Sequence, residues 1–282
     1  MIPTEFDYTA PESLDEAIAA LREGGEDAKL LAGGHSLLPL MKLRLAAPTL
    51  LVDLRRVPGL SGIEREDGTL RIGAMTHHAE LEDRPDLGII SHAAHKIADR
   101  QVRHRGTIGG SLAHGDPASD LPAVLLATDG SVSVKGEGGV REIAAADLFH
   151  DYLTTAVEDG EVLTEIRMPA LEGYAYAYEK FTRRAEDWSM VGVCALVKRS
   201  DGTCEDVRVG LTHMSSVPLR ATAVEDALRG QPLERDAIAR AAESAAQGTE
   251  PPGDLNATPD CKRNLARVLT RRALERAAGL TP

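Results

Sequence analysis

The sequence predicts an α+β protein, and three observations support this prediction. The chain opens with an amphipathic helix that starts at a capping box near Ser13. Short apolar strands then lead into two paired-glycine turns, one at Gly33-Gly34 and one at Gly109-Gly110. From Tyr174 onward the pattern changes to strand-like alternation, which is followed by helices. A first half of mixed helices and strands, followed by an antiparallel meander with helices after it, is typical of the α+β class.

The first half of the chain has clear helix and strand signals. The helix after Ser13 carries one apolar face and ends at Gly24-Gly25. Strands are expected at residues 29–32, 49–54 and 69–74, and a helix at residues 89–102. His77-His78 follows a strand end and is expected at a helix N-terminus, and a further helix is expected to begin at Asp120, a good N-cap.

The second half reads as a meander followed by helices. A strand at residues 161–168 ends at Pro169, and further strands are expected from Tyr174, at 191–197 and at 207–212, with a hairpin turn at Asp201-Gly202. Helices are expected at residues 221–228, 234–247 and 260–278.

The change of texture at residues 169–173 predicts a domain boundary. The expected domains are 1–170 and 171–282, and the first is expected to divide into subdomains of about 1–54 and 55–170.

Composition excludes several classes of function. The formal net charge of −12, from 32 basic and 44 acidic residues, argues against nucleic acid or an anionic membrane as the principal partner. No apolar run approaches the length of a membrane span, and the first residues have no signal-peptide pattern. We therefore expect a cytoplasmic protein.

Metal chemistry has little support in the sequence. The three cysteines are widely spaced and form no C-x-x-C pair, which disfavours a disulfide framework, a zinc site or an iron–sulfur cluster held by this chain alone. His92, His95 and Asp99 have the spacing of one helical face, which suits either a metal site or, more often, a polar helix surface. No metal is predicted.

The two glycine turns are the strongest candidate for a binding site. Neither matches the dinucleotide motif G-x-G-x-x-G or the phosphate loop G-x-x-x-x-G-K-[ST]. Glycine nevertheless lets backbone N–H groups approach an anion closely, and Ser36, Thr107 and Ser111 add hydroxyl donors. Together the turns predict one anion site.

Four stretches carry a resemblance to a known family: FDYTAPESLDEAIAAL, LLAGGHSLLPLMKLRL, TIGGSLAHGDPASDLPAVLLA and CKRNLARVLTRRAL. The chain resembles the flavoprotein (medium) subunits of molybdenum hydroxylases, the carbon monoxide dehydrogenase type above all. The resemblance implies a FAD-binding domain of the PCMH/vanillyl-alcohol-oxidase type, built from two α+β subdomains. A C-terminal antiparallel sheet with helices is expected to cover the flavin.

The resemblance also implies which residues hold FAD. The expected cofactor-binding residues lie in both glycine segments and at four positions farther along: Ala32, Gly33, Gly34, His35, Ser36, Leu37, Thr107, Gly109, Gly110, Ser111, His114, Asp120, Leu163 and Lys180. Relatives often carry Asn where this chain has Ser111, which is shorter but remains a donor. Leu163 is expected beside the adenine or the flavin edge.

Lys180 and Trp188 are expected to act at the flavin itself. An ammonium near a reduced flavin stabilises its negative charge and raises its potential. An aromatic ring at the Trp188 position shields the flavin from water and oxygen. Three interpretations of Arg183 and Arg184 remain open: the two side chains bind FAD, form ion pairs with Asp187, or are solvated.

His35 carries an alternative. The sequence GGH also occurs in covalent flavoprotein oxidases of the related fold, where the histidine is joined to the flavin. Those loops usually have an arginine two residues before the glycine pair, whereas this chain has Leu31 there. Noncovalent FAD is therefore predicted.

The leading hypothesis is an electron-transfer subunit that carries FAD. It takes electrons from iron–sulfur clusters on a small partner subunit and works beside a molybdopterin large subunit, in a dimer of heterotrimers. One alternative is a free-standing FAD-dependent oxidase or reductase with covalent flavin at His35. Another is a degenerate relative that serves as an assembly protein and binds no flavin.

Overall fold

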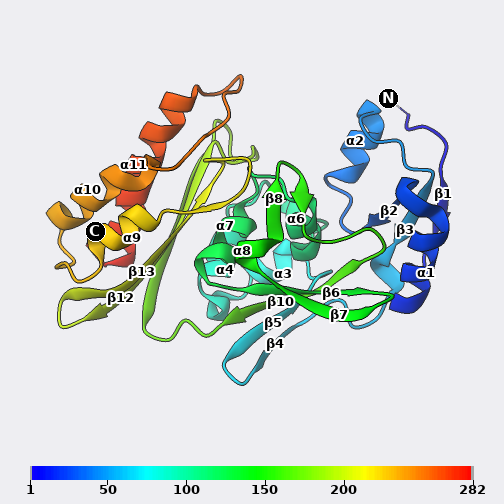
Figure 1. The fold of residues 1–282 in the computed structure, drawn as a ribbon, viewed down its shortest axis with the longest axis horizontal. Coiled ribbons are helices and arrows are strands. Elements are labelled where there is room, and N and C mark those ends of the chain that lie inside the picture. Colours follow the sequence, from blue (N-terminus) through cyan, green and yellow to red (C-terminus); the bar gives the residue numbers. More distant parts are fainter. Residues whose placement is uncertain (1, 281–282) are drawn as a thin grey trace.

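The computed structural model describes residues 2–280, and Figure 1 shows three groups of elements side by side. The blue N-terminal group lies at one end, the cyan and green group in the middle, and the yellow and red C-terminal group at the other end. No helix within residues 2–280 is both long and apolar enough to cross a membrane.

The N-terminal group is a small parallel sheet with two helices. Its strands lie in the order β1 (Asp7–Thr9), β3 (Leu50–Asp53) and β2 (Ala28–Leu31). The helices are α1 (Leu14–Gly24) and α2 (Leu37–Leu43), and the predicted cap is present, because the Ser13 hydroxyl accepts the N–H of Glu16. The first glycine segment follows directly after the end of strand β2 and leads into α2.

The middle group is a five-stranded sheet with helices. The strand order is β4 (Ile63–Glu66), β5 (Thr69–Gly73), β10 (Val162–Pro169), β6 (Ser131–Gly136) and β7 (Gly139–Ala144). The helices are α3 (His78–Glu82), α4 (Ile89–Ala94), α5 (Arg100–Arg103), α6 (Ile108–His114), α7 (Asp120–Ala127) and α8 (Ala145–Leu148). A short hairpin, β8 (Phe149–Asp151) with β9 (Thr154–Thr155), follows α8.

The C-terminal group contains the predicted antiparallel meander and its helices. The strands are β11 (Tyr174–Phe181), β12 (Val191–Ser200), β13 (Thr203–Thr212) and β14 (Leu219–Arg220). The helices are α9 (Thr222–Leu228), α10 (Arg235–Ala242) and α11 (Pro259–Ala277). Among the described residues 2–280, four 3-10 helices lie between these elements: Gly25–Asp27, Leu54–Arg56, Pro85–Leu87 and Glu243–Ala246.

Separate hydrophobic cores stabilise these groups. The largest apolar cluster lies under the five-stranded sheet and its helices and reaches Tyr178 and Cys194 of the meander. A second cluster fills the space between the meander and α9 to α11, and a third lies under α1. Because the first cluster spans both β10 and β12, the middle and C-terminal groups are packed together.

Three local predictions were wrong. The helix expected over residues 89–102 is interrupted at Ala98, whose φ is 39°, and Arg103 donates to the carbonyls of Ile97 and Ala98 that the break leaves free. Gly109-Gly110 is no turn: Thr107 caps α6, which contains both glycines. Asp120 is the first residue of α7 and not its N-cap, because its carboxylate is bonded elsewhere.

Candidate functional site

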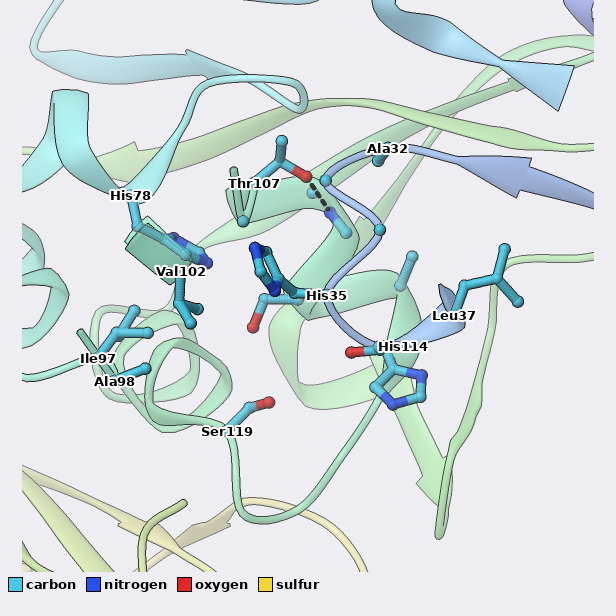
Figure 2. A pocket seen from close by; sticks show the side chains of 18 of the residues that line it. Ala32, His35, Leu37, His78, Ile97, Ala98, Val102, Thr107, His114 and Ser119 are labelled. Carbon is cyan, nitrogen blue, oxygen red and sulfur yellow. Dashed lines mark hydrogen bonds between the residues drawn. The ribbon is translucent and has the colours of Figure 1, made fainter. Parts of the chain in front are cut away.

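A single cavity of about 480 Å³ collects the predicted site residues. It lies where the N-terminal, middle and C-terminal groups of elements meet, and Figure 2 shows part of its lining. All the residues predicted for FAD and for the flavin chemistry line it: Ala32, Gly33, Gly34, His35, Ser36, Leu37, Thr107, Gly109, Gly110, Ser111, His114, Asp120, Leu163, Lys180 and Trp188. Residues that lie up to 156 positions apart in the sequence, from Ala32 to Trp188, therefore line the same cavity.

The first glycine segment presents unused backbone donors. It joins β2 to α2, and the N–H groups of residues 33–36 donate to no group within residues 2–280. Gly34 has a φ of 78°, a conformation that glycine adopts without strain. Successive free N–H groups beside a left-handed residue form a concave anion-binding surface.

The two glycine segments lie directly against each other. A Cβ at Gly33 would come within 2.2 Å of the Arg105 carbonyl oxygen, and one at Gly109 within 2.4 Å of the Ala74 Cβ. Thr107 Oγ1 accepts the N–H of Gly110 at 3.2 Å, the bond that Figure 2 draws as a dashed line. These glycines are thus required by close packing, Gly33 against the second segment and Gly109 against Ala74. The N–H groups of Gly109 and Gly110 donate to the Ala74 carbonyl and to Thr107 Oγ1, so the second segment offers the cavity its side-chain hydroxyls.

A buried ion pair forms another part of the wall. Lys180 Nζ lies 2.8 Å from Asp120 Oδ2, and the two side chains are 6% and 5% exposed. The other carboxylate oxygen accepts from the hydroxyls of Tyr178 at 2.7 Å and Ser189 at 2.6 Å. Burial and the neighbouring Asp120 carboxylate raise the pKa of Tyr178 well above its usual value, so that the phenol stays protonated and donates.

Trp188 and its neighbours border the cavity at the surface. Trp188 is 55% exposed, and Asp187 accepts the backbone N–H of Arg184 at 3.1 Å. Arg183 donates to Asn256, and neither arginine forms an ion pair with Asp187 within the part of the chain that the structure describes. Of the three interpretations of these arginines, an ion pair with Asp187 is therefore not formed among the described residues.

Several cavity residues were missed by the sequence analysis. The most informative is His78 on α3, which is 5% exposed and whose Nδ1 has no hydrogen-bond partner within residues 2–280. Burial lowers the pKa of His78 to about 4. Most of the other missed residues are apolar, among them Leu30, Leu40, Leu54, Met75, Ile97, Ala98, Val102 and Val162, whereas Lys29, Ser119 and Glu186 are polar. Apolar residues of this kind carry no sequence signal that separates a cofactor wall from ordinary core.

The three residues of the possible metal face have other contacts. His92 packs edge-on against Tyr176, His95 Nδ1 lies 3.7 Å from Glu82 Oε2, and Asp99 caps α5. Within residues 2–280 no group of three or more histidine, cysteine or carboxylate side chains is placed to hold a metal ion.

The cavity fits FAD by its donor chemistry. The free N–H groups at residues 33–36, with the hydroxyls of Ser36 and Ser111, suit a pyrophosphate. The apolar walls suit aromatic rings, and a single buried ammonium lies among them.

Comparisons with known proteins place the whole chain in one family. A family model described as the FAD binding domain in molybdopterin dehydrogenase matches residues 4–171, and one described as the CO dehydrogenase flavoprotein C-terminal domain matches residues 176–277. The carbon monoxide dehydrogenase medium chain of Hydrogenophaga pseudoflava is 42% identical over 282 residues, which are 98% of both chains. The 6-hydroxypseudooxynicotine dehydrogenase complex subunit alpha of Paenarthrobacter nicotinovorans is 38% identical over 283 residues, covering 98% of this chain and 96% of that one.

Solved structures agree. The structure of carbon monoxide dehydrogenase from Hydrogenophaga pseudoflava that lacks the Mo-pyranopterin moiety is 43% identical, with a TM-score of 0.96 and 100% of both chains covered. Quinoline 2-oxidoreductase from Pseudomonas putida 86 is 33% identical, with a TM-score of 0.95 and 99% of both chains covered. The free-standing oxidase is therefore not favoured, and the predicted cofactor, noncovalent FAD, is that of this family. The chain belongs to the FAD-binding medium-subunit family of the molybdenum hydroxylases, as the electron-transferring oxidoreductase subunit of an assembly with iron–sulfur and molybdenum subunits.

Proposed function

We propose that the cavity holds FAD extended between the two glycine segments and the Asp120–Lys180 pair. The observation that carries this proposal is the convergence of all the predicted FAD positions on one cavity. The backbone of residues 33–36 and the hydroxyls of Ser36 and Ser111 bind the pyrophosphate. Lys180 and Trp188 lie at the flavin, and Leu163, which lines the cavity, lies beside the adenine or the flavin edge.

The flavin supplies an electron acceptor and donor within the cavity, and the protein supplies its surroundings. Asp120, Tyr178 and Ser189 fix the Lys180 ammonium in a position from which it stabilises negative charge. Trp188 restricts access of water from the open side of the cavity. His78 remains neutral under the cavity wall at neutral pH, since burial lowers its pKa to about 4.

The division of the chain supports this arrangement. We place the boundary between domains 1–170 and 171–282, with subdomains of about 1–54 and 55–170. The division at residue 170 is supported by the apolar cluster that lies wholly within the C-terminal domain, and by the two matched family models, of which the first ends at residue 171 and the second begins at residue 176. Lys180 then comes from the C-terminal domain and Asp120 from the FAD-binding domain, so that the ion pair joins them.

The finer assembly is also proposed. Electrons enter from iron–sulfur clusters on a small partner subunit, and the complex is a dimer of heterotrimers. Family membership supports this proposal. A cytoplasmic location agrees with the three free cysteines, of which Cys261 is exposed. Relatives named for carbon monoxide, caffeine and nicotine leave the substrate of the complex open.

The first test is an absorption spectrum of the purified chain, taken before and after acid precipitation. Free FAD in the supernatant is expected. Yellow colour retained in the pellet would show that the flavin is covalently attached and would favour the alternative with covalent flavin at His35. A colourless chain that takes up no FAD would overturn the proposal. The native mass of the chain co-expressed with its partner subunits then tests the stoichiometry.

A further inference from the structure

His213, just after β13, lies where three segments of the chain meet. Its backbone N–H donates to the carbonyl of Pro117 at 2.9 Å, three residues before Asp120. Its ring Nδ1 lies 2.7 Å from the carbonyl oxygen of Ser189, and its Nε2 lies 3.2 Å from Nζ of Lys262 on α11. One half-buried side chain thus contacts the segment before α7, the segment that carries Trp188 and the last helix.

The partners of His213 fix its protonation state. A carbonyl oxygen only accepts hydrogen bonds, so Nδ1 carries the hydrogen. The Lys262 side chain is fully buried and its Nζ donates to Asp254 Oδ2 at 2.7 Å. An ammonium has no lone pair, so Nε2 of His213 must be the acceptor. Only the neutral Nδ1–H tautomer satisfies both neighbours.

This histidine is connected to the cavity through Ser189. The Ser189 carbonyl accepts from His213, while its hydroxyl donates to Asp120 at 2.6 Å. Asp120 in turn pairs with Lys180. A continuous line of polar contacts therefore runs from the cavity ammonium to the buried ammonium of α11.

We propose that His213 is a positioning residue, which as a neutral Nδ1–H tautomer holds Asp120 and Trp188 in place around the cavity. The structural part of this proposal stands on the contacts alone. Its meaning for flavin binding rests on the proposed function, because it assumes that FAD occupies the Lys180 end of the cavity.

The proposal includes a response to pH. The charged groups that face His213 are Lys262 from α11, Asp254 from the segment before it and Asp116 from the segment before α7. Protonation of His213 would remove the acceptor for Lys262 and place two cations side by side. Burial and the Lys262 charge lower the pKa of His213, so the neutral form prevails near pH 7 and is lost in acid.

The test uses the single tryptophan of the chain, Trp188, as its reporter. The full chain and two variants, His213→Gln and His213→Leu, are compared by Trp188 emission without FAD and by FAD titration, each from pH 8 to pH 5. Glutamine offers an NH2 donor group and a carbonyl acceptor but does not titrate, whereas leucine offers neither donor nor acceptor. Circular dichroism and thermal melting check that each variant is folded.

The natural chain is expected to show an acid-induced shift in Trp188 emission and weaker FAD binding over the same pH range. His213→Gln should keep the pH 8 values and lose the acid response, and His213→Leu should bind FAD roughly tenfold more weakly at every pH. An acid response that persists in His213→Gln, or His213→Leu values equal to those of the natural chain, would overturn the proposal. Because the emission arm needs no FAD, a chain that responds to acid but takes up no FAD refutes the proposed function and leaves the positioning role standing.

Discussion

Asp120 and Lys180 form an ion pair with an Oδ2–Nζ distance of 2.8 Å, although they are 60 positions apart and belong to α7 and β11. The Lys180 ammonium also donates to the carbonyl of Lys96 at 3.0 Å. The ammonium at this end of the cavity is therefore partly compensated by a carboxylate. Its effect on a nearby flavin depends on both charges.

Lys180→Met is expected to lower both the stability of the chain and the reduction potential of the bound FAD. Removing one partner of a buried ion pair costs about 3–5 kcal/mol, because the other charge is left without compensation. The remaining Asp120 carboxylate would then disfavour negative charge on the flavin. Urea unfolding and a redox titration of the FAD-loaded chain measure the two effects.

The double variant Lys180→Met/Asp120→Asn is the matched control. It removes both charges, so it should recover much of the lost stability and move the FAD potential back toward the natural value. A Lys180→Met potential equal to that of the natural chain would show that the ammonium has no electrostatic role at the flavin.

Gly109→Ala is expected to destabilise the chain and abolish FAD binding. On helix propensity alone the change should stabilise α6 by about 0.5–1 kcal/mol. The new Cβ would instead lie within 2.4 Å of the Ala74 Cβ, and overpacking of this kind costs about 1–3 kcal/mol. Gly138→Ala is the control, because a Cβ there meets nothing within 4 Å. Thermal melting and FAD titration of both variants decide whether packing or propensity prevails.

Thr107→Val and Ser36→Ala should separate folding from cofactor binding. Thr107 Oγ1 caps α6, so its loss should cost about 1 kcal/mol of stability as well as FAD affinity. The Ser36 side chain makes no capping bond to α2, so Ser36→Ala should weaken FAD binding and leave the unfolding free energy nearly unchanged. Equal FAD affinity in Ser36→Ala and the natural chain would remove this hydroxyl from the proposed pyrophosphate site.

Local signals explain what could be predicted from the sequence. The capping box at Ser13 gave the start of α1 within one residue, and alternation from Tyr174 gave β11. Many residues of the cavity were predictable from the sequence, because the motifs around Gly33 and Gly109 are short continuous segments and both segments line the cavity. The conformation of the second stretch was not predictable, because Gly109-Gly110 reads as a turn unless Thr107 is seen to cap a helix.

Long-range contacts explain what was missed. Asp120 reads as a helix cap, yet its carboxylate is taken by Lys180, Tyr178 and Ser189, none of which lies near it in sequence. The break at Ala98 depends on Arg103 satisfying two carbonyls, an arrangement that periodicity does not encode. Residue patterns therefore located the binding segments, and the tertiary contacts determined the charge balance between them.

His78 is expected to make the stability of the chain fall in acid. Its pKa is about 4 in the folded chain and about 6.5 when unfolded, so the unfolded state binds more protons between these values. Stability is thus fully present above about pH 6.5 and falls by up to about 3 kcal/mol as the pH drops toward 4. Urea unfolding of the natural chain and of His78→Gln, at pH 7.5 and pH 5, isolates this contribution, because glutamine does not titrate. The difference in unfolding free energy between the two pH values should be smaller in His78→Gln. An identical difference in both proteins would assign the acid sensitivity to other groups and would place His78 in a wetter setting than its unpartnered Nδ1 indicates.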